Sequence, residues 1–185
     1  MGSYLLGIDI GTSSVKASLV EVASGKTVAS ASAPAEEMKI ISHQPGWAEQ
    51  HPDTWWIHTV ESVKLAIKGL AGEKNEIVAI GIAYQMHGLV VVDKSHQPLR
   101  PSIIWCDSRA VSIGEEALQQ LGNQYCLQNL LNSPGNFTAS KLKWVKDNEP
   151  EVYKNIAKVM LPGDYIALRL TGEVSTTAKI GRAHV

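Results

Sequence analysis

Apolar and polar positions alternate along the N-terminal part of the chain. Residues 4–10 (YLLGIDI) and 14–22 (SVKASLVEV) read as two strands, with a period of two in the second, and residues 27–33 (TVASASA) read as a third. Glycine and small hydroxyl residues at 11–13, and the ASGK sequence at 23–26, predict tight turns between these strands. The pattern therefore predicts an antiparallel meander.

A helical pattern follows a loop that is rich in proline and polar residues. Asp53, directly after Pro52, is placed where a helix start is expected. Apolar residues then recur at spacings of four and three, namely Trp56, Val60, Val63, Ile67 and Leu70. These spacings predict one apolar helix face. The next segment, 76–85 (EIVAIGIAYQ), is almost continuously apolar, which is typical of a central buried strand.

The remaining chain alternates short strands with helices. Strands are predicted at 88–93 and 101–107, and helices at 112–122 with Gly122 as the end, on both sides of Pro150 within 138–160, and at 162–172. Strands followed by alternating helices and strands predict an α/β layer fold in one domain.

Composition narrows the class of protein. The chain has 185 residues, of which 44% are hydrophobic and 19% charged, as in ordinary globular domains. Its net charge of −1 argues against nucleic-acid binding, and no apolar run reaches the ~20 residues that a membrane span needs. No secretion signal is recognisable, so we expect a cytoplasmic protein. Cys106 and Cys126 are then expected to be reduced and to serve as small buried hydrophobic residues.

The first candidate site is an acid followed by a turn of small residues. Asp9 ends the first strand and precedes Gly11, Thr12 and Ser13, with Lys16 in the next strand. Backbone N–H groups and hydroxyls of such a turn can bind a phosphate, and Asp9 beside a phosphate makes sense as a Mg²⁺ ligand. The alternative is a plain hairpin in which Asp9 caps its own backbone. The turn is neither a Walker loop nor a dinucleotide-binding loop, since both of these lead into a helix.

Two further polar clusters follow apolar strands. In YQMHG, Gln85 and His87 lie at a predicted strand end, where ligand clefts of α/β sheets are found. The alternatives are a hydrogen-bonded structural histidine and a core position for the methionine between them. In WCDSR, Trp105, Asp107 and Arg109 could line a sugar site, or the acid and the arginine could pair as a structural clamp. Because all three clusters follow strands, we expect them to converge on one cleft.

These motifs resemble a known family. GIDIGTSSVKASLVE resembles the phosphate hairpin of the actin-like ATPase superfamily. Together with GWAEQHPDTWW, GIAYQMHGLVVVD, LRPSIIWCDSR, SPGNFTASKLKWVKDNEPEVY and MLPGDYIALRLTGE, it makes the chain similar to the FGGY carbohydrate kinases from about residue 4 to 178, and most similar to their xylulokinase branch. The Met86–His87 pair favours this branch over the glycerol kinases, which have Arg-Glu there. Asn136 stands where many members read from glycine straight to phenylalanine, so this loop is expected to differ locally.

The resemblance implies a fold and a set of site residues. The fold is α/β of the actin-like ATPase (ribonuclease H-like) type, with a mixed sheet, N-terminal antiparallel hairpins and flanking helices, in truncated form. Asp9 is implied as the catalytic acid that positions Mg²⁺ and phosphate. The implied phosphate or ATP contacts are Gly11, Thr12, Ser13 and Lys16, and the implied sugar contacts are Gln85, Met86, His87, Trp105, Asp107 and Arg109.

The same resemblance implies an activity. In the complete enzyme the primary hydroxyl of a ketose, D-xylulose, attacks ATP in the presence of Mg²⁺, and a downstream Asp accepts the proton. The partners are thus a small sugar and ATP, with a homodimer allowed for the complete form. Kinases for ribulose or gluconate, or a non-kinase actin-like ATPase, are the alternatives.

The resemblance also bears on the extent of the domain. Residues 1–178 are expected to form an incomplete N-terminal kinase domain without the second, nucleotide-binding domain, and hence without useful activity. Residues 179–185 (KIGRAHV) complete no element, and IGRAHV matches what a common sequencing adapter encodes, so we expect a non-native tail.

Overall fold

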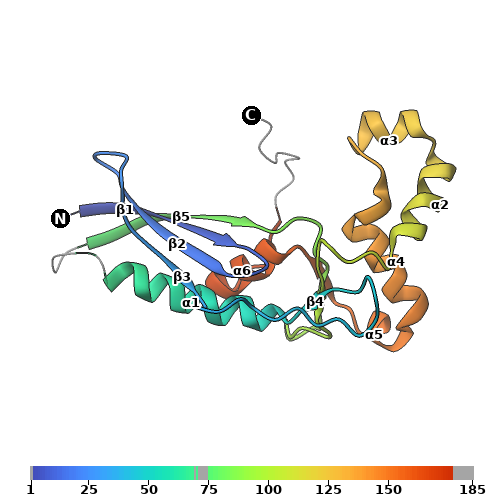
Figure 1. Cartoon of the computed structure of the whole chain (residues 1–185), viewed down its shortest axis with the longest axis horizontal. Coiled ribbons are helices and arrows are strands. Elements are labelled where there is room, and N and C mark those ends of the chain that lie inside the picture. The colour runs from blue at the N-terminus through green and yellow to red at the C-terminus, as the bar shows by residue number, and fades with distance from the viewer. Residues whose placement is uncertain (1, 69, 71–74, 177–185) are drawn as a thin grey trace.

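The main sheet has four strands in the computed structural model, which describes residues 2–68, 70 and 75–176 (Figure 1). Its order is β3-β2-β1-β5; three strands form the predicted antiparallel meander, and the fourth lies parallel to β1. The strands are β1 (Gly2–Ile10), β2 (Val15–Glu21), β3 (Thr27–Ala33) and β5 (Asn75–Tyr84). The predicted meander and mixed sheet are therefore confirmed. The predicted tail, residues 179–185, lies outside the described residues.

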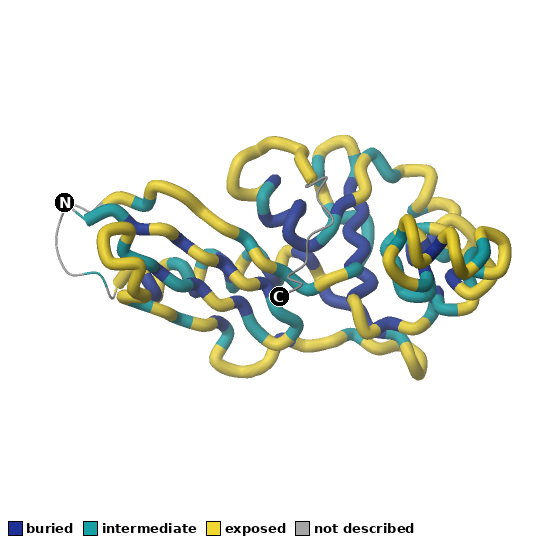
Figure 2. The backbone as a smooth tube through the Cα atoms, turned by 90° about the horizontal axis from the view of Figure 1, so that it is seen from above, coloured by how far each residue is buried: buried dark blue, intermediate teal, exposed yellow. Residues whose placement is uncertain are grey.

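Buried and exposed residues alternate along β1, which appears as alternating colours along the tube that begins at the N-terminus (Figure 2). The strand therefore has one buried and one open face. Leu6, Ile8 and Ile10 are buried in the main core, whereas Gly7 and Asp9 are exposed. The strand register places Asp9 opposite Lys16 of β2, which is also exposed. The predicted acid at the end of the first strand therefore points away from the core.

Helix α1 (Pro52–Lys68) covers the buried face of the sheet (Figure 1). Its fully buried residues include Trp55, Thr59, Ser62 and Ala66, and small side chains at three of these positions let the helix backbone approach the sheet closely. The predicted apolar face is confirmed in part: Trp56 and Val63 pack half-buried against the main core, whereas Ile67 is exposed. The predicted stripe therefore lies at the margin of the contact.

Strand β5 was predicted to be central and buried, and this is also wrong. It forms an edge of the sheet, and Val78 and Ile80 are 50% and 49% exposed. Within the described residues no strand pairs with its second edge. The continuous apolar run therefore belongs to an edge strand, in which Ile77 and Ile82 pack against the main core while Val78 and Ile80 are exposed.

A second group of elements extends from the end of the sheet away from the N-terminus (Figure 1). Two small sheets are β4 (Glu49–Gln50) with β7 (Ser102–Ile103), and β6 (Val90–Val92) with β8 (Lys158–Met160). The helical elements of this group are α2 (Val111–Leu121), α3 (Asn123–Asn129), η1 (Pro134–Asn136), α4 (Thr138–Asn148) and α5 (Pro150–Lys154). Helix α6 (Pro162–Thr171) lies instead beside α1 and β5, where Tyr165, Ile166 and Leu168 belong to the main core. The predicted strands at 88–93 and 101–107 and four predicted helices are confirmed, while β4, β8, α3 and η1 were not predicted.

Close packing at one glycine positions the end of β5. A Cβ atom on Gly163, in the first turn of α6, would lie 2.0 Å from Cδ1 of Tyr84. Only a residue without a side chain lets α6 begin against the last residue of β5. The helix start therefore supports the polar segment that follows this strand.

None of the described helices combines the length and the hydropathy that a membrane span demands.

Candidate functional site

A tight turn joins β1 to β2 at the edge of the site. The Gly11 amide donates to the Ser14 carbonyl over 3.0 Å, and the Ser13 carbonyl accepts from the Met38 amide. Within the described ranges, the amides of Thr12 and Ser13 donate to no backbone or side-chain group. These two N–H groups are therefore available to an anion.

Asp9 lies beside this turn on the open face of the sheet. In the described part of the chain its carboxylate accepts no backbone hydrogen bond, so the capping alternative is not observed. Asp9 and Lys16 line an open hollow of ≈ 440 Å³ whose other walls include Gly7, Ser18 and Gly81. Because these neighbours are small, a ligand can approach the sheet backbone closely.

The residues around Asp9 fit a Mg²⁺ ion that is held only in part by the protein. No group of three or more metal-ligating side chains is found among the described residues. A single carboxylate is the donor set expected of a Mg²⁺ site that completes its shell with phosphate oxygens and water. Asp9 therefore fits a nucleotide-bound ion rather than a metal held by protein alone.

Thr12 connects the turn with the two other predicted clusters. Its hydroxyl accepts a hydrogen bond from Trp105 Nε1 over 2.9 Å and donates a longer one, 3.4 Å, to Gln85 Oε1. The backbone N–H of Gln85 in turn donates to the carbonyl of Ile10, at the end of β1. The turn thus meets, at one hydroxyl, two segments that lie 73 and 93 residues further along the chain. Members of the three predicted clusters are therefore brought together.

Gln50 supports this junction from its buried side and was not predicted as a site residue. It is 2% exposed, and its amide nitrogen donates to the Thr12 carbonyl over 2.7 Å. Its amide oxygen accepts from Trp55 Nε1 at 3.0 Å and from Gln85 Nε2 at 3.3 Å. Because both ends of the amide are used, Gln50 fixes the Thr12 backbone and the Gln85 side chain together. No sequence signal distinguishes such a residue, since its partners are distant in the chain.

The YQMHG segment makes a strained turn. His87 has a φ of 56°, in the left-handed region that is unfavourable for a residue other than glycine. Its ring stacks on Phe137, with centroids 5.1 Å apart and an angle of 26° between the planes. Met86 is 45% exposed, so the structure does not place it in the core. The turn thus presents a methionine to solvent while the histidine is anchored.

Asp107 and Arg109 form a buried clamp. Arg109 donates from Nε to both Asp107 oxygens, at 2.9 and 3.0 Å, and from Nη2 at 2.7 Å. Their side chains are 0% and 1% exposed. Asp107 also accepts from the amides of Ala48 and Arg109. The acid and the arginine therefore pair with each other, which was the structural alternative of the two.

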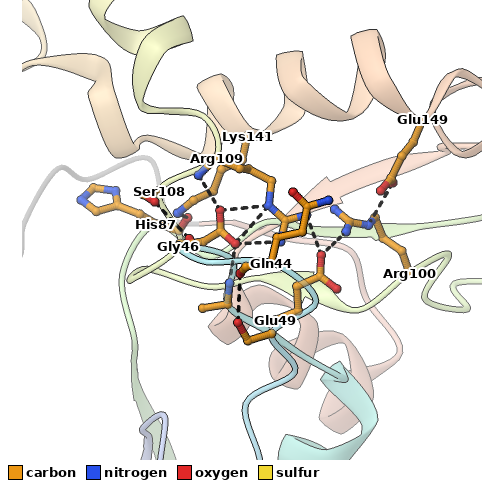
Figure 3. A network of polar contacts seen from close by, with 12 residues as sticks. Gln44, Gly46, Glu49, His87, Arg100, Ser108, Arg109, Lys141 and Glu149 are labelled. Atoms are coloured by element: carbon orange, nitrogen blue, oxygen red, sulfur yellow. Dashed lines mark hydrogen bonds and ion pairs between the residues drawn. The ribbon is translucent and has the colours of Figure 1, made fainter.

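The clamp belongs to a larger ionic network (Figure 3). Arg109 Nη1 lies 2.7 Å from Glu49 Oε1, Glu49 also pairs with Arg100, and Arg100 Nε lies 3.1 Å from Glu149 Oε2. The Arg109 guanidinium lies 3.8 Å from the ring centroid of Trp47 and 4.8 Å from that of Trp144. Buried charges in such a network are compensated by one another. The network anchors the segment that carries Trp105.

Lys141 of α4 lies next to this network and was also not predicted (Figure 3). Its side chain is buried, and Nζ donates to the His87 carbonyl over 2.8 Å. Burial lowers the pKa of Lys141 from 10.5 to about 8, although the charge of Asp107 opposes the shift. Lys141 lies four residues from Phe137 and from Val145, and a lysine on the apolar face of a helix is the signal that could have identified it.

The two cysteines behave differently from one another. Both are free thiols, and Cys126 is buried as predicted. Cys106 is exposed, so its predicted place in the core is wrong; it follows Trp105 in the open segment after β7. Partial burial is nevertheless the main reason that the pKa of Cys106 is raised.

The predicted residues named below thus fall into three groups. Thr12, Gln85 and Trp105 are in direct contact, whereas Asp107 and Arg109 lie buried behind them. Asp9 and Lys16 lie on the open face of the neighbouring strands. A turn with two available N–H groups therefore adjoins a wall that carries an exposed indole and polar side chains.

Comparisons with known proteins agree with this arrangement. The profile of the FGGY family of carbohydrate kinases, N-terminal domain, matches residues 4–183. A curated relative, xylulose kinase of Klebsiella pneumoniae, is 39% identical over 171 residues, which is 92% of this chain and 34% of the relative.

Solved structures give the same picture. The crystal structure of xylulose kinase from Rhodospirillum rubrum has a TM-score of 0.83 at 30% identity, over 92% of this chain and 35% of that one. Gluconate kinase from Lactobacillus acidophilus has a TM-score of 0.82 at 29% identity, over 94% of this chain and 34% of that one. The chain spans about a third of the length of the relatives that it matches.

Proposed function

The chain belongs to the FGGY family of carbohydrate kinases, with the predicted α/β fold of the actin-like ATPases, and from this premise we propose that it is the N-terminal part of an enzyme that transfers a phosphoryl group from ATP to the primary hydroxyl of D-xylulose. The observation that carries the proposal is the junction at Thr12. One hydroxyl there joins the turn with available amides to Gln85 and to the exposed Trp105. A phosphate site and a sugar wall that share a residue are what transfer to an alcohol requires.

The sugar wall suits a small polyhydroxy compound. The Trp105 indole is 45% exposed and offers a flat apolar face, while Gln85 and the His87 turn supply polar groups at its side. Sugars present both apolar C–H faces and hydroxyls, so this mixture of groups can bind and orient a ketose. We assign Gln85, Met86, His87 and Trp105 to direct sugar contacts.

The clamp residues contribute to the same wall in a different way. Asp107 and Arg109 use their charged groups on each other and on Glu49. We assign them to holding the Trp105 segment rather than to the main sugar contacts. In this assignment Asp107 and Arg109 support the sugar pocket without contacting the sugar through their charged groups.

The phosphate end of the site is formed by the β1–β2 turn. Gly11, Thr12 and Ser13 place backbone N–H groups at the edge of the open hollow, where Lys16 adds a positive charge. Asp9 is the residue that would hold Mg²⁺ together with the phosphates of ATP. When bound there, the ion would offset the negative charge that develops on the transferred phosphoryl group.

Turnover is expected only from a longer protein. The chain spans about a third of the length of its relatives. The family resemblance implies a proton-accepting Asp beyond residue 178. We therefore propose that the 185-residue chain binds ligand weakly and has no useful kinase activity.

A kinase for another sugar is the second candidate. The fit to gluconate kinase is nearly as good as the fit to xylulose kinase, with TM-scores of 0.82 and 0.83. The backbone therefore does not discriminate between these substrates, and the identity of the sugar depends on the side chains of the wall.

The experiment is a coupled ATP assay on the complete protein with D-xylulose, D-ribulose, D-gluconate and glycerol. We expect the highest kcat/KM with D-xylulose. Asp9→Asn should lower kcat by about 10²–10³ and alter the Mg²⁺ dependence. Asp147→Asn is the matched control, because Asp147 is exposed on α4 and pairs only with Lys143 among the described residues. Equal turnover of wild type and Asp9→Asn would contradict the proposed site, and preference for another sugar would replace D-xylulose.

A further inference from the structure

Lys141 has an environment unlike that of the other lysines. It is fully buried, whereas every other lysine in the described part of the chain is exposed. Burying an ammonium group is unfavourable unless it forms compensating hydrogen bonds. The partners of Lys141 therefore indicate what the residue does.

The first partner is the strained turn of the proposed sugar wall. Nζ donates to the His87 carbonyl over 2.8 Å, and His87 has the left-handed φ of 56°. Phe137, directly before α4, stacks on the His87 ring. Thr138 adds a long hydrogen bond, 3.5 Å, to the next carbonyl, that of Gly88. The start of α4 thus holds both the backbone and the ring of His87.

The second partner leads to the other half of the wall. Nζ also donates to the Asn136 carbonyl over 3.4 Å, and Asn136 Nδ2 donates to the Trp105 carbonyl. One ammonium group is therefore connected directly to the His87 turn (Figure 3) and, through Asn136, to the Trp105 segment. The two strand-end clusters are tied to each other from behind.

We propose that Lys141 is a positioning residue that fixes the His87 turn and the Trp105 segment in the geometry needed to bind the sugar. Lys141 makes this contribution from behind the wall. The inference rests on the proposed function, since it names the residue that sets the sugar side of that site.

The charges around Lys141 give the role a pH dependence. Asp107 and Cys106 favour the protonated amine, Arg109 disfavours it, and burial is the largest influence, so that its pKa is about 8. His87 faces the group through its carbonyl. A neutral amine donates a weaker hydrogen bond than an ammonium group. Sugar binding should therefore weaken as the pH rises through about 8.

The test compares Lys141→Met and Lys141→Arg with Lys143→Met in the complete protein. Lys143 is on the same helix, but its side chain is 55% exposed. We expect Lys141→Met to raise the KM for D-xylulose about tenfold, which corresponds to one charged hydrogen bond, with the KM for ATP within about twofold. Lys143→Met should change neither.

The pH profile separates positioning from a general structural effect. The sugar KM of the wild type should rise above pH 8, whereas that of Lys141→Arg should stay flat, because a guanidinium group remains charged. If Lys141→Met does not fold, this comparison decides alone. An unchanged sugar KM in Lys141→Met, an equal rise of both KM values, or the same pH profile in Lys141→Arg would overturn the role.

A measurement without substrate keeps this inference distinct from the proposed function. Hydrogen exchange of the peptide that carries residues 84–92 should be faster in Lys141→Met than in Lys143→Met. Faster exchange in a protein that phosphorylates no sugar would refute the proposed function and retain the link between Lys141 and the turn. Unchanged exchange would refute the link.

Discussion

The buried clamp gives the sharpest test of how the wall is held. Arg109→Met removes a guanidinium group that bonds to Asp107, pairs with Glu49 and lies over the rings of Trp47 and Trp144. Methionine fills much of the same apolar space, so the change removes charge and hydrogen bonds more than volume.

The expected loss follows from the burial of the partner. Breaking a buried ion pair from one side costs about 3–5 kcal/mol, because the remaining charge is uncompensated. Asp107 keeps the amides of Ala48 and Arg109 as donors, and the charge of Lys141 acts on it as well. We therefore expect Arg109→Met to lower the free energy of unfolding by about 3 kcal/mol, at the lower end of that range.

A double-mutant cycle isolates the pair. Asp107→Asn alone should cost a similar amount, whereas the double variant leaves no charge unpaired between these two positions. The coupling free energy should be about 2–3 kcal/mol. Urea unfolding of the chain, followed by tryptophan fluorescence and far-UV circular dichroism, measures all four proteins.

The chain contains a matched control pair. Arg169 and Asp53 also form an arginine–aspartate pair at 2.7 Å, and Arg169 also lies over a tryptophan, Trp56, but their side chains are 35% and 55% exposed. Their coupling should stay below about 1 kcal/mol. Equal coupling in the two cycles would refute the argument, because burial would then not determine the strength of the clamp.

Two further predictions test the wall and its support. Trp105→Phe keeps an aromatic face but removes the 2.9 Å hydrogen bond to Thr12. The KM for D-xylulose in the coupled assay should therefore rise by roughly 2–10-fold. The control variant Trp56→Phe, which lies away from the wall, should leave this KM unchanged. The second prediction concerns stability. The pKa of Lys141 is about 8 in the folded chain, whereas its ordinary value is 10.5. Between these pH values the unfolded chain therefore binds more protons than the folded chain. The free energy of unfolding of the wild type should therefore rise from pH 8 to 10.5 relative to Lys141→Met in urea titrations, and parallel curves would contradict the assigned burial.

The local pattern of apolar and polar residues was sufficient to predict those elements whose conformation depends on their own residues. The meander was predictable because each strand alternates and each turn has glycine or small polar residues. The orientation of α1 was not, because contact with a sheet selects small residues such as Ser62 and Ala66 over larger apolar ones. The edge position of β5 depends on which strands pair with it, and no property of its own sequence encodes this.

The exposed part of the site was predictable and its support was not. Asp9, Thr12 and Trp105 stand out in the sequence because polar or small residues interrupt or follow apolar runs. Gln50 and Lys141 satisfy carbonyls 38 and 54 residues away, and only the folded chain reveals these partners. A glutamine or a lysine carries no local mark of such a role, apart from the place of Lys141 on an apolar helix face.

This division between exposed and buried residues leads to different consequences of mutation. Asp9, Met86 and Trp105 are exposed, so their replacement should remove the proposed ligand contacts without leaving a buried group unpaired. Gln50 and Asp107 are buried, and their replacement leaves donors without partners at a cost of about 1–3 kcal/mol each. Variants at exposed positions should therefore change kinetic constants at nearly constant stability, whereas variants at these two positions should change both. Lys141 differs from the two groups, because its charged form is disfavoured in the fold while its amine still holds the His87 and Asn136 carbonyls, which its removal would leave without this donor. The cost of Lys141→Met in the free energy of unfolding should therefore grow from pH 8 to 10.5, whereas its effect on sugar binding should shrink over the same range, and this opposition is what a positioning role of the protonated amine predicts.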